Sequence, residues 1–466
     1  MSKSSVLTHI TFLAALSSAS AFAGSTIDAQ RVQLDALKAK SLQSELSYQV
    51  IESLTTEVGA RMVGTPANAK SVSWAVNKMH ELGFDKVWTE ESELPLWERG
   101  TMQAHIDGPY PHNVVALALG GSVGTNGKDL KAQVIEFASL ADLKAAPQGS
   151  LKGKIAFVSF KMERDIDGAG YGPAVGARVI GASVAADKGA VAFLMRSVGT
   201  DTNRTPHTGI SRYQPDVKQI PAVAISNPDA DLLVNMLARK QPVTFSLNMK
   251  GTGYTGEKVK IANVIGEITG SEHPEQVVTL GAHLDSWDVG TGAIDDGIGV
   301  GITLAAGHFI GQLPQAPKRT VRVILFAAEE VGLFGAKDYV AKHKDEMANH
   351  VIGAEWDFGN GNIYQLHPGV GTESLNEVRD FANYLAPMGV ALATTNTAKG
   401  QSDMEALGEL GQPAIDFNPD GLDYFDYHHT ENDTLDKVNQ AALKNNTAIY
   451  TLFAYFAAQS DIDFRK

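Results

Sequence analysis

Over residues 258–466, short apolar runs alternate with helical segments, an order that few fold classes accommodate. The final helix carries Ile449, Leu452, Phe453 and Phe456 on one face, at the spacing of helical turns. This alternation predicts an α/β fold in which helices cover both faces of a central sheet. The strands are predicted at residues 277–280, 321–326, 351–352 and 414–415, and the intervening helices at 297–310 and 334–343.

Two regions of different texture precede this one. Up to about Gly108 the pattern is helical, and its clearest apolar repeat starts at Val72 and stops at Gly83. From residue 112 to 255, short apolar strands lie between Gly and Pro residues, as expected for strands buried on both faces. This middle region contains no cluster of catalytic residues, so we expect a structural or lid domain. Its predicted strands are residues 154–158, 190–194 and 220–225.

The N-terminus has the order of a secretory signal. Residues 1–23 contain one cation, Lys3, then an apolar stretch and small residues that end with Ala21-Phe22-Ala23. The apolar stretch is too short to span a bilayer, and no later apolar run is long enough to do so. We therefore predict an exported protein, periplasmic or secreted, with no membrane span.

Composition excludes several classes of function. The chain has 39 Lys and Arg against 53 Asp and Glu, a net charge of −14, and binding to nucleic acid requires clustered cations instead. The 466 residues include no Cys, which excludes disulfides, thiolate metal sites and a cysteine nucleophile. Any metal must therefore be held by His, Asp, Glu or other oxygen donors.

Acidic and His residues follow the predicted strands of the C-terminal region. Charges at the ends of apolar strands are costly unless they are paired or bound to metal. A set of His and carboxylate groups without thiols is typical of catalytic zinc sites, and this set is large enough for two ions that share a carboxylate. The residues are His283, Asp285, Asp295, Asp296, Glu329, Glu330, Asp357, His428 and His429.

The pair Glu329-Glu330 is the most informative part of this set. Adjacent residues on a strand face opposite ways, but at the end of a strand one can bind metal while the other reaches an attacking water. A carboxylate next to an activated water is what a hydrolase requires. The buried character of the preceding Phe326-Ala327-Ala328 argues against two solvated side chains.

In their order along the chain, these residues resemble the co-catalytic zinc exopeptidases, a family of secreted aminopeptidases and glutamate carboxypeptidases. Within that family the chain resembles the carboxypeptidase Q subfamily, and the middle region resembles a protease-associated domain. The resemblance implies a zinc-exopeptidase catalytic domain with a mixed central sheet, split by an inserted domain at residues 112–255. Residues 24–111 and 256–466 would form the two parts of the catalytic domain. The matching motifs are His283-x-Asp285, Asp295-Asp296-Gly297, Glu329-Glu330, Asp357 and His429-x-x-x-Asp433.

The resemblance also implies a role for each residue. His283, Asp295 and Asp357 would hold one Zn²⁺, and Asp295, Glu330 and His429 a second, so that Asp295 bridges two Zn²⁺ ions. Glu329 would be the general base, and Asp285 would accept a hydrogen bond from His283 and fix its tautomer. The peptide bond between Asp295 and Asp296 would be cis. His429 is preferred over His428 because the family motif places an acid four residues after the ligand.

The substrate is less constrained. An acidic site suits the α-amino group of a dipeptide or short peptide with a free N-terminus, and no arginine stands out as a partner for a substrate carboxylate. Residues 401–404 read Gln-Ser-Asp-Met where many aminopeptidase relatives have Ser-Asp-His. Because of this difference, the resemblance does not define the substrate pocket or the side chain that it prefers. Two alternatives remain: a single-zinc aminoacyl transferase of the glutaminyl-cyclase type, and a receptor-like relative without activity. The resemblance further implies a homodimer.

Overall fold

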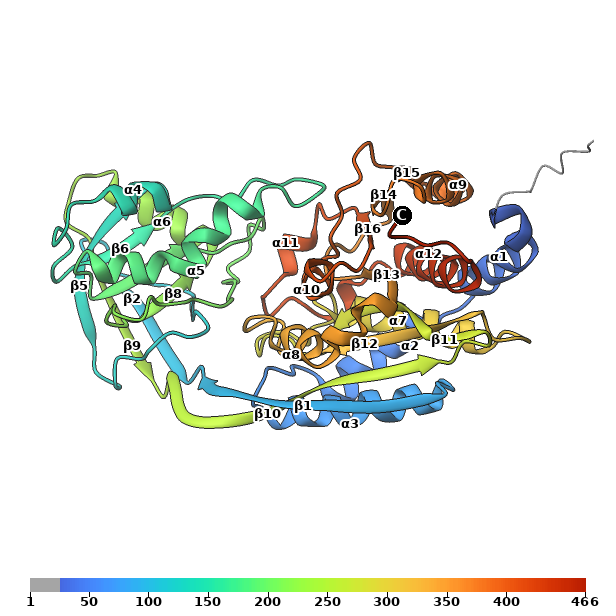
Figure 1. The fold of residues 1–466 in the computed structure, drawn as a ribbon. Helices are drawn as coiled ribbons and strands as arrows, with labels where there is room; N and C mark the ends of the chain where they lie inside the picture. The colour runs from blue at the N-terminus through green and yellow to red at the C-terminus, as the bar shows by residue number, and fades with distance from the viewer. Residues whose placement is uncertain (1–25) are drawn as a thin grey trace, which may run out of the picture.

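The computed structural model describes residues 26–466, and these form two sheets that lie side by side (Figure 1). The predicted signal at residues 1–23 lies outside the described residues. Among the residues described, no helix combines the length and the apolar character needed to cross a membrane.

The larger sheet is mixed. Its three central strands, β12 (Arg319–Phe326), β11 (His273–His283) and β13 (His350–Glu355), are parallel, and β16 (Ala414–Pro419) continues them beside β13. On one side, β10 (Gly253–Ile268) and β1 (Lys86–Glu98) are added antiparallel. On the other side lie β14 (Ile363–Gly369), antiparallel to β16, and the short β15 (Ala391–Leu392). The α/β class with a mixed central sheet is therefore confirmed.

Helices cover both faces of this sheet because its parallel strands are apolar on both sides. One face is covered by α7 (Gly297–Gly311), α12 (Gln440–Gln459) and α3 (Pro66–Glu81), with α1 (Thr26–Leu42) and α2 (Leu46–Ser53) packed outside them. On the opposite face, α8 (Phe334–His343) and α10 (Met404–Glu409) pack on Ile265, Ile324 and Phe326. A further helix of this domain, α9 (Leu375–Leu385), packs near β15 and α1, and the short α11 (Tyr424–Tyr427) precedes His428.

The smaller sheet is formed by the middle region of the chain. Its strand order is β3-β2-β9-β5-β6-β7-β8-β4. The helices α4 (Leu140–Ala145) and α5 (Tyr171–Asp187) pack on one face, and α6 (Asn227–Leu237) packs on the other. The strands are β2 (Thr101–Gly108), β3 (His112–Asn113), β4 (Ala116–Ala118), β5 (Leu130–Phe137), β6 (Ile155–Val158), β7 (Ala192–Arg196), β8 (Ala222–Ile225) and β9 (Thr244–Lys250).

One expectation about the N-terminal region was wrong. The helical pattern ends at α3, and residues 86–108 form β1 and β2 instead of continuing as helix. One face of β1 is largely exposed and carries charged residues, which interrupt the apolar pattern of the strand. The strand is held instead by its long pairing with β10. Since β2 pairs with β9, the smaller sheet also begins before the predicted boundary at residue 112.

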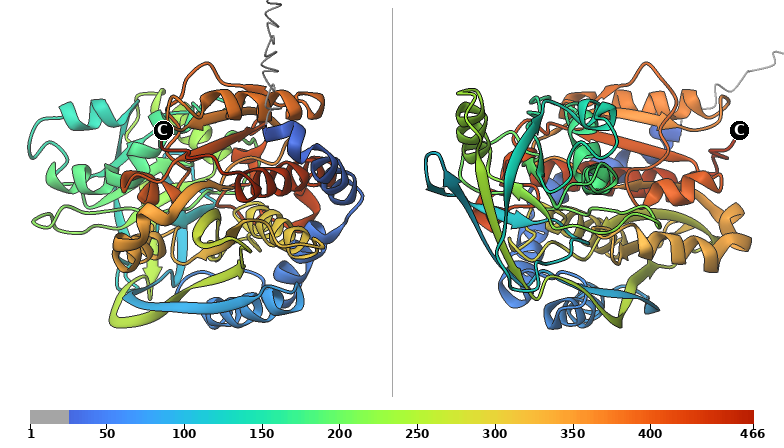
Figure 2. Two further views of the ribbon diagram at one scale, coloured as in Figure 1. Left: turned by 45° about the vertical axis from the view of Figure 1, so that its right-hand side comes forward. Right: turned by 90° about the vertical axis from the view of Figure 1, so that its left-hand side faces the viewer.

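Two antiparallel chain segments connect the domains. β1 continues into β2, and β9 returns into β10, so the same long pair of segments takes part in both sheets (Figure 1). The two turned views show the smaller domain beside the C-terminal part of the larger one (Figure 2). This placement brings the smaller domain to the edge of the larger sheet at which its parallel strands end.

Candidate active site

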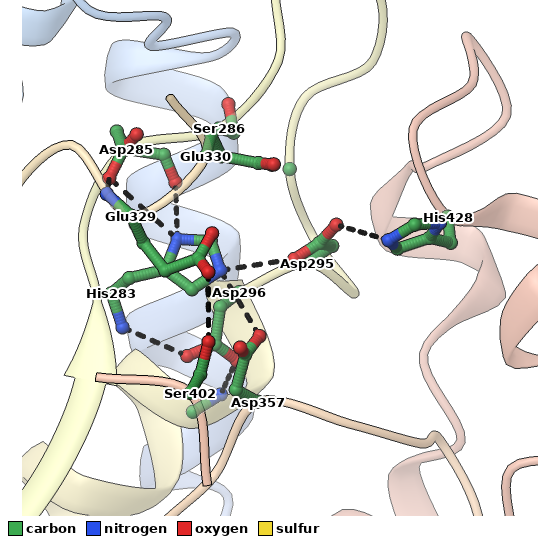
Figure 3. A network of polar contacts seen from close by, with 12 residues as sticks. His283, Asp285, Ser286, Asp295, Asp296, Glu329, Glu330, Asp357, Ser402 and His428 are labelled. Carbon is green, nitrogen blue, oxygen red and sulfur yellow. Dashed lines mark hydrogen bonds and ion pairs between the residues drawn. The ribbon is translucent and has the colours of Figure 1, made fainter. Parts of the chain in front are cut away.

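The predicted site residues come together at the carboxyl ends of the parallel strands. His283 is the last residue of β11, and Asp357 follows β13 by two residues. Glu329 and Glu330 follow β12, which is parallel to β11 and ends beside it. Figure 3 shows these side chains converging from their separate strands. Ligand sites in α/β sheets form at this edge because neighbouring strand ends leave a crevice there.

The loop before α7 places Asp295 between the strand ends. Asp296 caps α7: its carboxylate accepts hydrogen bonds from Gly299 N at 2.9 Å and from His283 N at 3.2 Å. A Cβ at position 299 would lie 2.3 Å from Asp296 Oδ2, so this turn requires glycine. Asp433 accepts hydrogen bonds from the backbone of Ile294 and Asp295. The Asp295–Asp296 peptide bond is cis, as expected.

Asp295 offers one oxygen to each of two groups. Its Oδ1 lies 3.1 Å from His283 Nε2, which is also 3.2 Å from Asp357 Oδ1. Its Oδ2 lies 3.3 Å from His429 Nε2, which is 2.9 Å from Glu330 Oε2. Distances of this size occur between neighbouring ligand atoms around a metal ion, and the Asp295 carboxylate lies between two groups of potential ligand atoms.

The two adjacent histidines are not equivalent. His429 Nε2 faces both Glu330 and Asp295, whereas His428 Nε2 reaches only Asp295, at 3.7 Å. Their rings are stacked with centroids 3.5 Å apart. Burial, together with its neighbour His429, lowers the pKa of His428 well below its usual range. His428 is therefore a neutral neighbour of the cluster, although it remains within reach of a metal held by Asp295 and His429.

Burial sets the electrostatics of this cluster. Burial, followed by the charge of Asp357, raises the pKa of Glu329 to about 8, and burial raises the pKa of Glu330. For His283, burial opposes the charged form, but Asp357 and Asp295 outweigh it and raise its pKa well above the usual range. Acidic groups so crowded need added positive charge in order to ionise together.

The residues fit metal cations. Glu330 Oε1 and Asp285 Oδ2 are buried without a hydrogen-bond partner among the described residues, although an unmatched buried carboxylate oxygen is costly. The potential ligand atoms of His283, Asp295 and Glu330 lie within 4.8 Å of one another, as do those of Asp295, His428 and His429. Nitrogen and carboxylate donors at this spacing suit zinc.

Asp285 differs from the expectation in one respect. His283 Nδ1 lies 3.1 Å from the backbone oxygen of Asp285, and the carboxylate is farther away, at 3.8 Å. The backbone carbonyl is therefore the group that accepts from Nδ1–H and turns Nε2 toward Asp295 and Asp357. The Asp285 carboxylate instead accepts a hydrogen bond from Glu329 N at 3.1 Å, which holds the backbone of the predicted base.

The segment at residues 401–404 also contributes in a way that the sequence did not indicate. Ser402 Oγ donates to Glu329 Oε1 at 2.8 Å, so Ser402 contacts the predicted base. Met404 is buried beneath β11 and β13, where Gly281 and Gly353 leave room for it, and it does not line the cavity. The departure from the Ser-Asp-His pattern therefore lies below the site.

A cavity of about 680 Å³ opens over Asp295, Glu329 and Glu330. Tyr171, Arg178 and Arg212 form part of its wall, and all three come from the inserted domain. We expected a structural or lid domain, and no arginine stood out in the sequence as a partner for a substrate carboxylate. The contribution of these three residues to the cavity wall was therefore not predicted. The sequence gives no signal for them, because they are scattered over a region whose motifs are structural.

Comparison with known proteins agrees with this geometry. The chain matches peptidase family M28 over residues 263–454 and the PA domain over residues 115–233. It is 32% identical to carboxypeptidase Q of Mus musculus over 415 residues, which are 89% of this chain and 86% of the relative, and 32% identical to carboxypeptidase Q of Homo sapiens over 416 residues, again 89% and 86%.

Solved structures give the same picture. A peptidase M28 precursor from Shewanella amazonensis SB2B superposes with a TM-score of 0.92 at 46% identity, covering 94% of this chain and 99% of that one. A zinc aminopeptidase from Bacillus subtilis has the same fold, with a TM-score of 0.64 at 22% identity, covering 91% and 98%.

Proposed function

Since the chain belongs to peptidase family M28 and is a zinc metallo-exopeptidase, we propose that it is a binuclear enzyme that cleaves dipeptides or short peptides with a free N-terminus. The observation that carries the proposal is the position of Asp295, whose two oxygens face two separate groups of ligand atoms. We further propose export, from the signal-like order of residues 1–23, and a homodimer, from the carboxypeptidase Q resemblance.

We assign the ligands as follows. His283 and Asp357 hold one Zn²⁺, Glu330 and His429 hold the other, and Asp295 is shared. When bound, zinc lowers the pKa of a water molecule toward neutrality and polarises the scissile carbonyl. The remaining tasks, which are to place the substrate and move protons, belong to side chains of this chain.

Glu329 is assigned to proton transfer. It is half-buried, lies adjacent to the cluster, and forms no ion pair with the histidines of the cluster, so its carboxylate is available to the attacking water. Asp285 fixes its backbone, and Ser402 donates to one of its carboxylate oxygens. The other oxygen is then directed to take a proton from water and return it to the leaving amine.

The substrate is assigned from the charges of the cavity. Its floor is rich in carboxylates, which attract an α-amino group. Arg212 lines the same cavity and forms no ion pair with any residue described here. In our proposal this cation receives the C-terminal carboxylate of a dipeptide, which favours short substrates over long ones.

A matched panel of peptides tests the assignment. The zinc-loaded enzyme is incubated with one dipeptide in free, N-acetylated and C-terminally amidated forms, and kcat/KM is measured for each. We expect acetylation to lower kcat/KM about 10–100-fold and amidation to lower it about tenfold, because each removes a charge-assisted contact. Equal rates on free and acetylated dipeptides would refute the assigned N-terminal specificity.

Metal content separates the alternatives. A single-zinc aminoacyl transferase of the glutaminyl-cyclase type would bind close to one equivalent of zinc, whereas the five ligands proposed here require two. A receptor-like relative would leave every peptide of the panel intact. Elemental analysis together with the panel therefore distinguishes the three proposals.

A further inference from the structure

The loop that carries His429 is held from outside the catalytic domain. Thr208, in the inserted domain, donates its backbone N–H to the His429 carbonyl at 3.1 Å. In return, His429 Nδ1 lies 3.2 Å from the Thr208 carbonyl. The two residues thus exchange hydrogen bonds across the domain boundary, and one of these bonds involves the imidazole ring itself.

The preceding residue is held by a second contact. His207 Nδ1 lies 2.7 Å from the carbonyl oxygen of His428, and its Nε2 lies 2.6 Å from Asp201 Oδ2. A carbonyl can only accept, so Nδ1 carries a proton and donates it. Asp201 fixes the other end of the ring, and both side chains are 1% exposed. No water competes at that burial, which makes the orientation of the ring well defined.

His429 needs such support. Its backbone has φ +60°, in the left-handed region that non-glycine residues rarely occupy. This conformation turns the side chain back toward Glu330 and Asp295, and it persists only where the surroundings enforce it. His207 and Thr208 contact the carbonyl groups of the two peptides that flank the His429 Cα, and these contacts supply that constraint.

The orientation of the His429 ring follows from the same contacts. If Nε2 binds metal, the ring proton lies on Nδ1, which must then donate to an acceptor. Thr208 O is such an acceptor. Arg178 Nη1 lies 3.3 Å from the same nitrogen, but it is a donor and cannot accept that proton. Of the two groups of the inserted domain that face Nδ1, the Thr208 carbonyl is therefore the one that supports the tautomer with Nε2 free.

We propose that the inserted domain is part of the metal centre, because Asp201, His207 and Thr208 position His429 as a ligand. The proposal rests on the assignment of His429 made above. It makes His207 and Asp201 positioning residues that touch neither substrate nor metal. It also replaces the expectation of a lid, since an opening of the inserted domain would break the hydrogen bonds of His429.

The test uses His207→Phe, which keeps a planar ring and removes the donor, and His207→Asn, which restores a donor near the Nδ1 position. Zinc affinity is measured in the full-length chain by competition with a chromophoric chelator, without any assay of activity. We expect His207→Phe to weaken one of two zinc equivalents about 10–100-fold, the usual effect of losing a group that orients a ligand. His207→Asn should recover most of that loss.

Three further variants separate the possible explanations. Phe245→Leu alters the buried core of the inserted domain on β9, so it should lower stability while leaving zinc affinity unchanged. His429→Ala should lose the same zinc equivalent as His207→Phe. Asp201→Asn barely changes the side-chain volume, so it replaces His207→Phe in the test if that variant does not fold. We expect Asp201→Asn to lower the affinity for the same zinc equivalent at least about threefold.

The outcomes are distinct. If His207→Phe and Asp201→Asn are folded and bind both equivalents with wild-type affinity, the pair only packs the boundary and the inference is wrong. If Phe245→Leu loses zinc as strongly as His207→Phe, the effect is general destabilisation, which also overturns it. If His429→Ala keeps both equivalents, the proposed ligand set fails instead.

Discussion

Buried charged groups are paired near the amino ends of the parallel strands, whereas at the carboxyl ends several of them lack a partner. Toward their amino ends, Arg322 on β12 donates to Glu267 at 2.9 and 2.6 Å and to the Tyr339 hydroxyl at 2.6 Å. Tyr339 in turn lies 2.8 Å from His350 Nε2, and His350 Nδ1 lies 3.2 Å from the Glu346 carbonyl. Each polar group in this series of contacts therefore has a partner of opposite charge or of matching hydrogen-bond type.

At the carboxyl ends, acids gather without enough partners. Glu330 Oε1, Asp285 Oδ2 and Glu355 Oε1 are all buried and lack a hydrogen-bond partner among the described residues. Burial raises the pKa of Glu330 and of Glu355. The same sheet therefore satisfies its charges internally at one end and leaves them to be satisfied by ligands at the other. That contrast, rather than the number of charges, marks the functional end.

The largest expected effect comes from the general base. Glu329→Gln removes the proton acceptor but no proposed ligand, so both zinc ions should remain bound. Turnover should fall at least about 10²–10⁴-fold, the usual contribution of positioned acid–base catalysis. Glu330→Gln removes a charged ligand instead, so one zinc should bind far more weakly and activity should partly return in excess zinc. Metal analysis and kcat at several zinc concentrations measure both.

The outcomes of this pair are diagnostic. Loss of zinc from Glu329→Gln but not from Glu330→Gln would shift the assignment by one residue. Near-wild-type behaviour of both would mean that two solvated glutamates lie at the end of β12, and the proposed active site would be wrong.

Substitutions near the amino ends of the parallel strands should change the stability of the protein but not its activity. Glu267→Gln leaves the Arg322 guanidinium buried with its principal counter-charge removed, which typically costs about 3–5 kcal/mol of unfolding free energy. Because Glu267 lies at the end of the sheet opposite to the metal ligands, kcat/KM should be unchanged at temperatures where the variant is folded. Denaturant unfolding and kinetics on the same preparation measure the two quantities. A selective loss of kcat/KM in a fully folded variant would break the distinction between the two ends.

Removal of zinc should lower the stability of the protein through the site at the carboxyl ends of the strands, and not through the paired groups at the amino ends. Zinc that binds the native state stabilises it by about 2.7 kcal/mol per site when its free concentration is 100 times Kd. Chelation should therefore lower Tm, and added zinc should restore it. The increase on zinc addition should be smaller in Glu330→Gln and unchanged in Glu267→Gln. Equal Tm values with and without chelator would indicate that the orphaned carboxylates do not bind metal.

Sequence reasoning succeeded where the signal was local. The apolar runs before His283, Glu329 and Asp357 predicted strands of an α/β sheet. The structure shows that these strands are parallel, which brings their carboxyl ends together. The helix at Phe334–His343 was predicted with its observed bounds. The family is confirmed by the comparisons, whereas the residue roles remain proposals.

The failures were non-local. β1 was missed because its apolar pattern depends on a partner strand whose paired residues lie 155 to 181 residues later in the chain. Arg212 and His207 were missed because their importance depends on how the inserted domain folds back over the site. No local pattern encodes that contact. Only the positions of both domains show that His207 lies against the loop of His429.

The smallest expected effect is the response of His350 to pH. Burial, together with the nearby Arg322 cation, lowers its pKa to about 4, and its Nε2 must accept a hydrogen bond from Tyr339. In the unfolded chain an unperturbed histidine has a pKa of about 6.5. Between these values the unfolded state binds more protons than the folded state, so stability is complete above about pH 6.5 and falls as pH decreases toward 4. At pH 5 the loss from this residue should be about 2 kcal/mol.

His350→Gln isolates that contribution, because glutamine is neutral at every pH and can still accept from Tyr339. The buried carboxylates and the metal ligands titrate in both proteins, so the difference between the proteins cancels them. We expect the variant to be less stable than wild type at pH 7.5, through imperfect packing, and to lose about 2 kcal/mol less between pH 7.5 and pH 5. Urea unfolding at the two pH values, in excess zinc, measures this. Parallel losses in the two proteins would show that His350 is not held neutral, and that the amino ends of the strands are less completely paired than their geometry indicates.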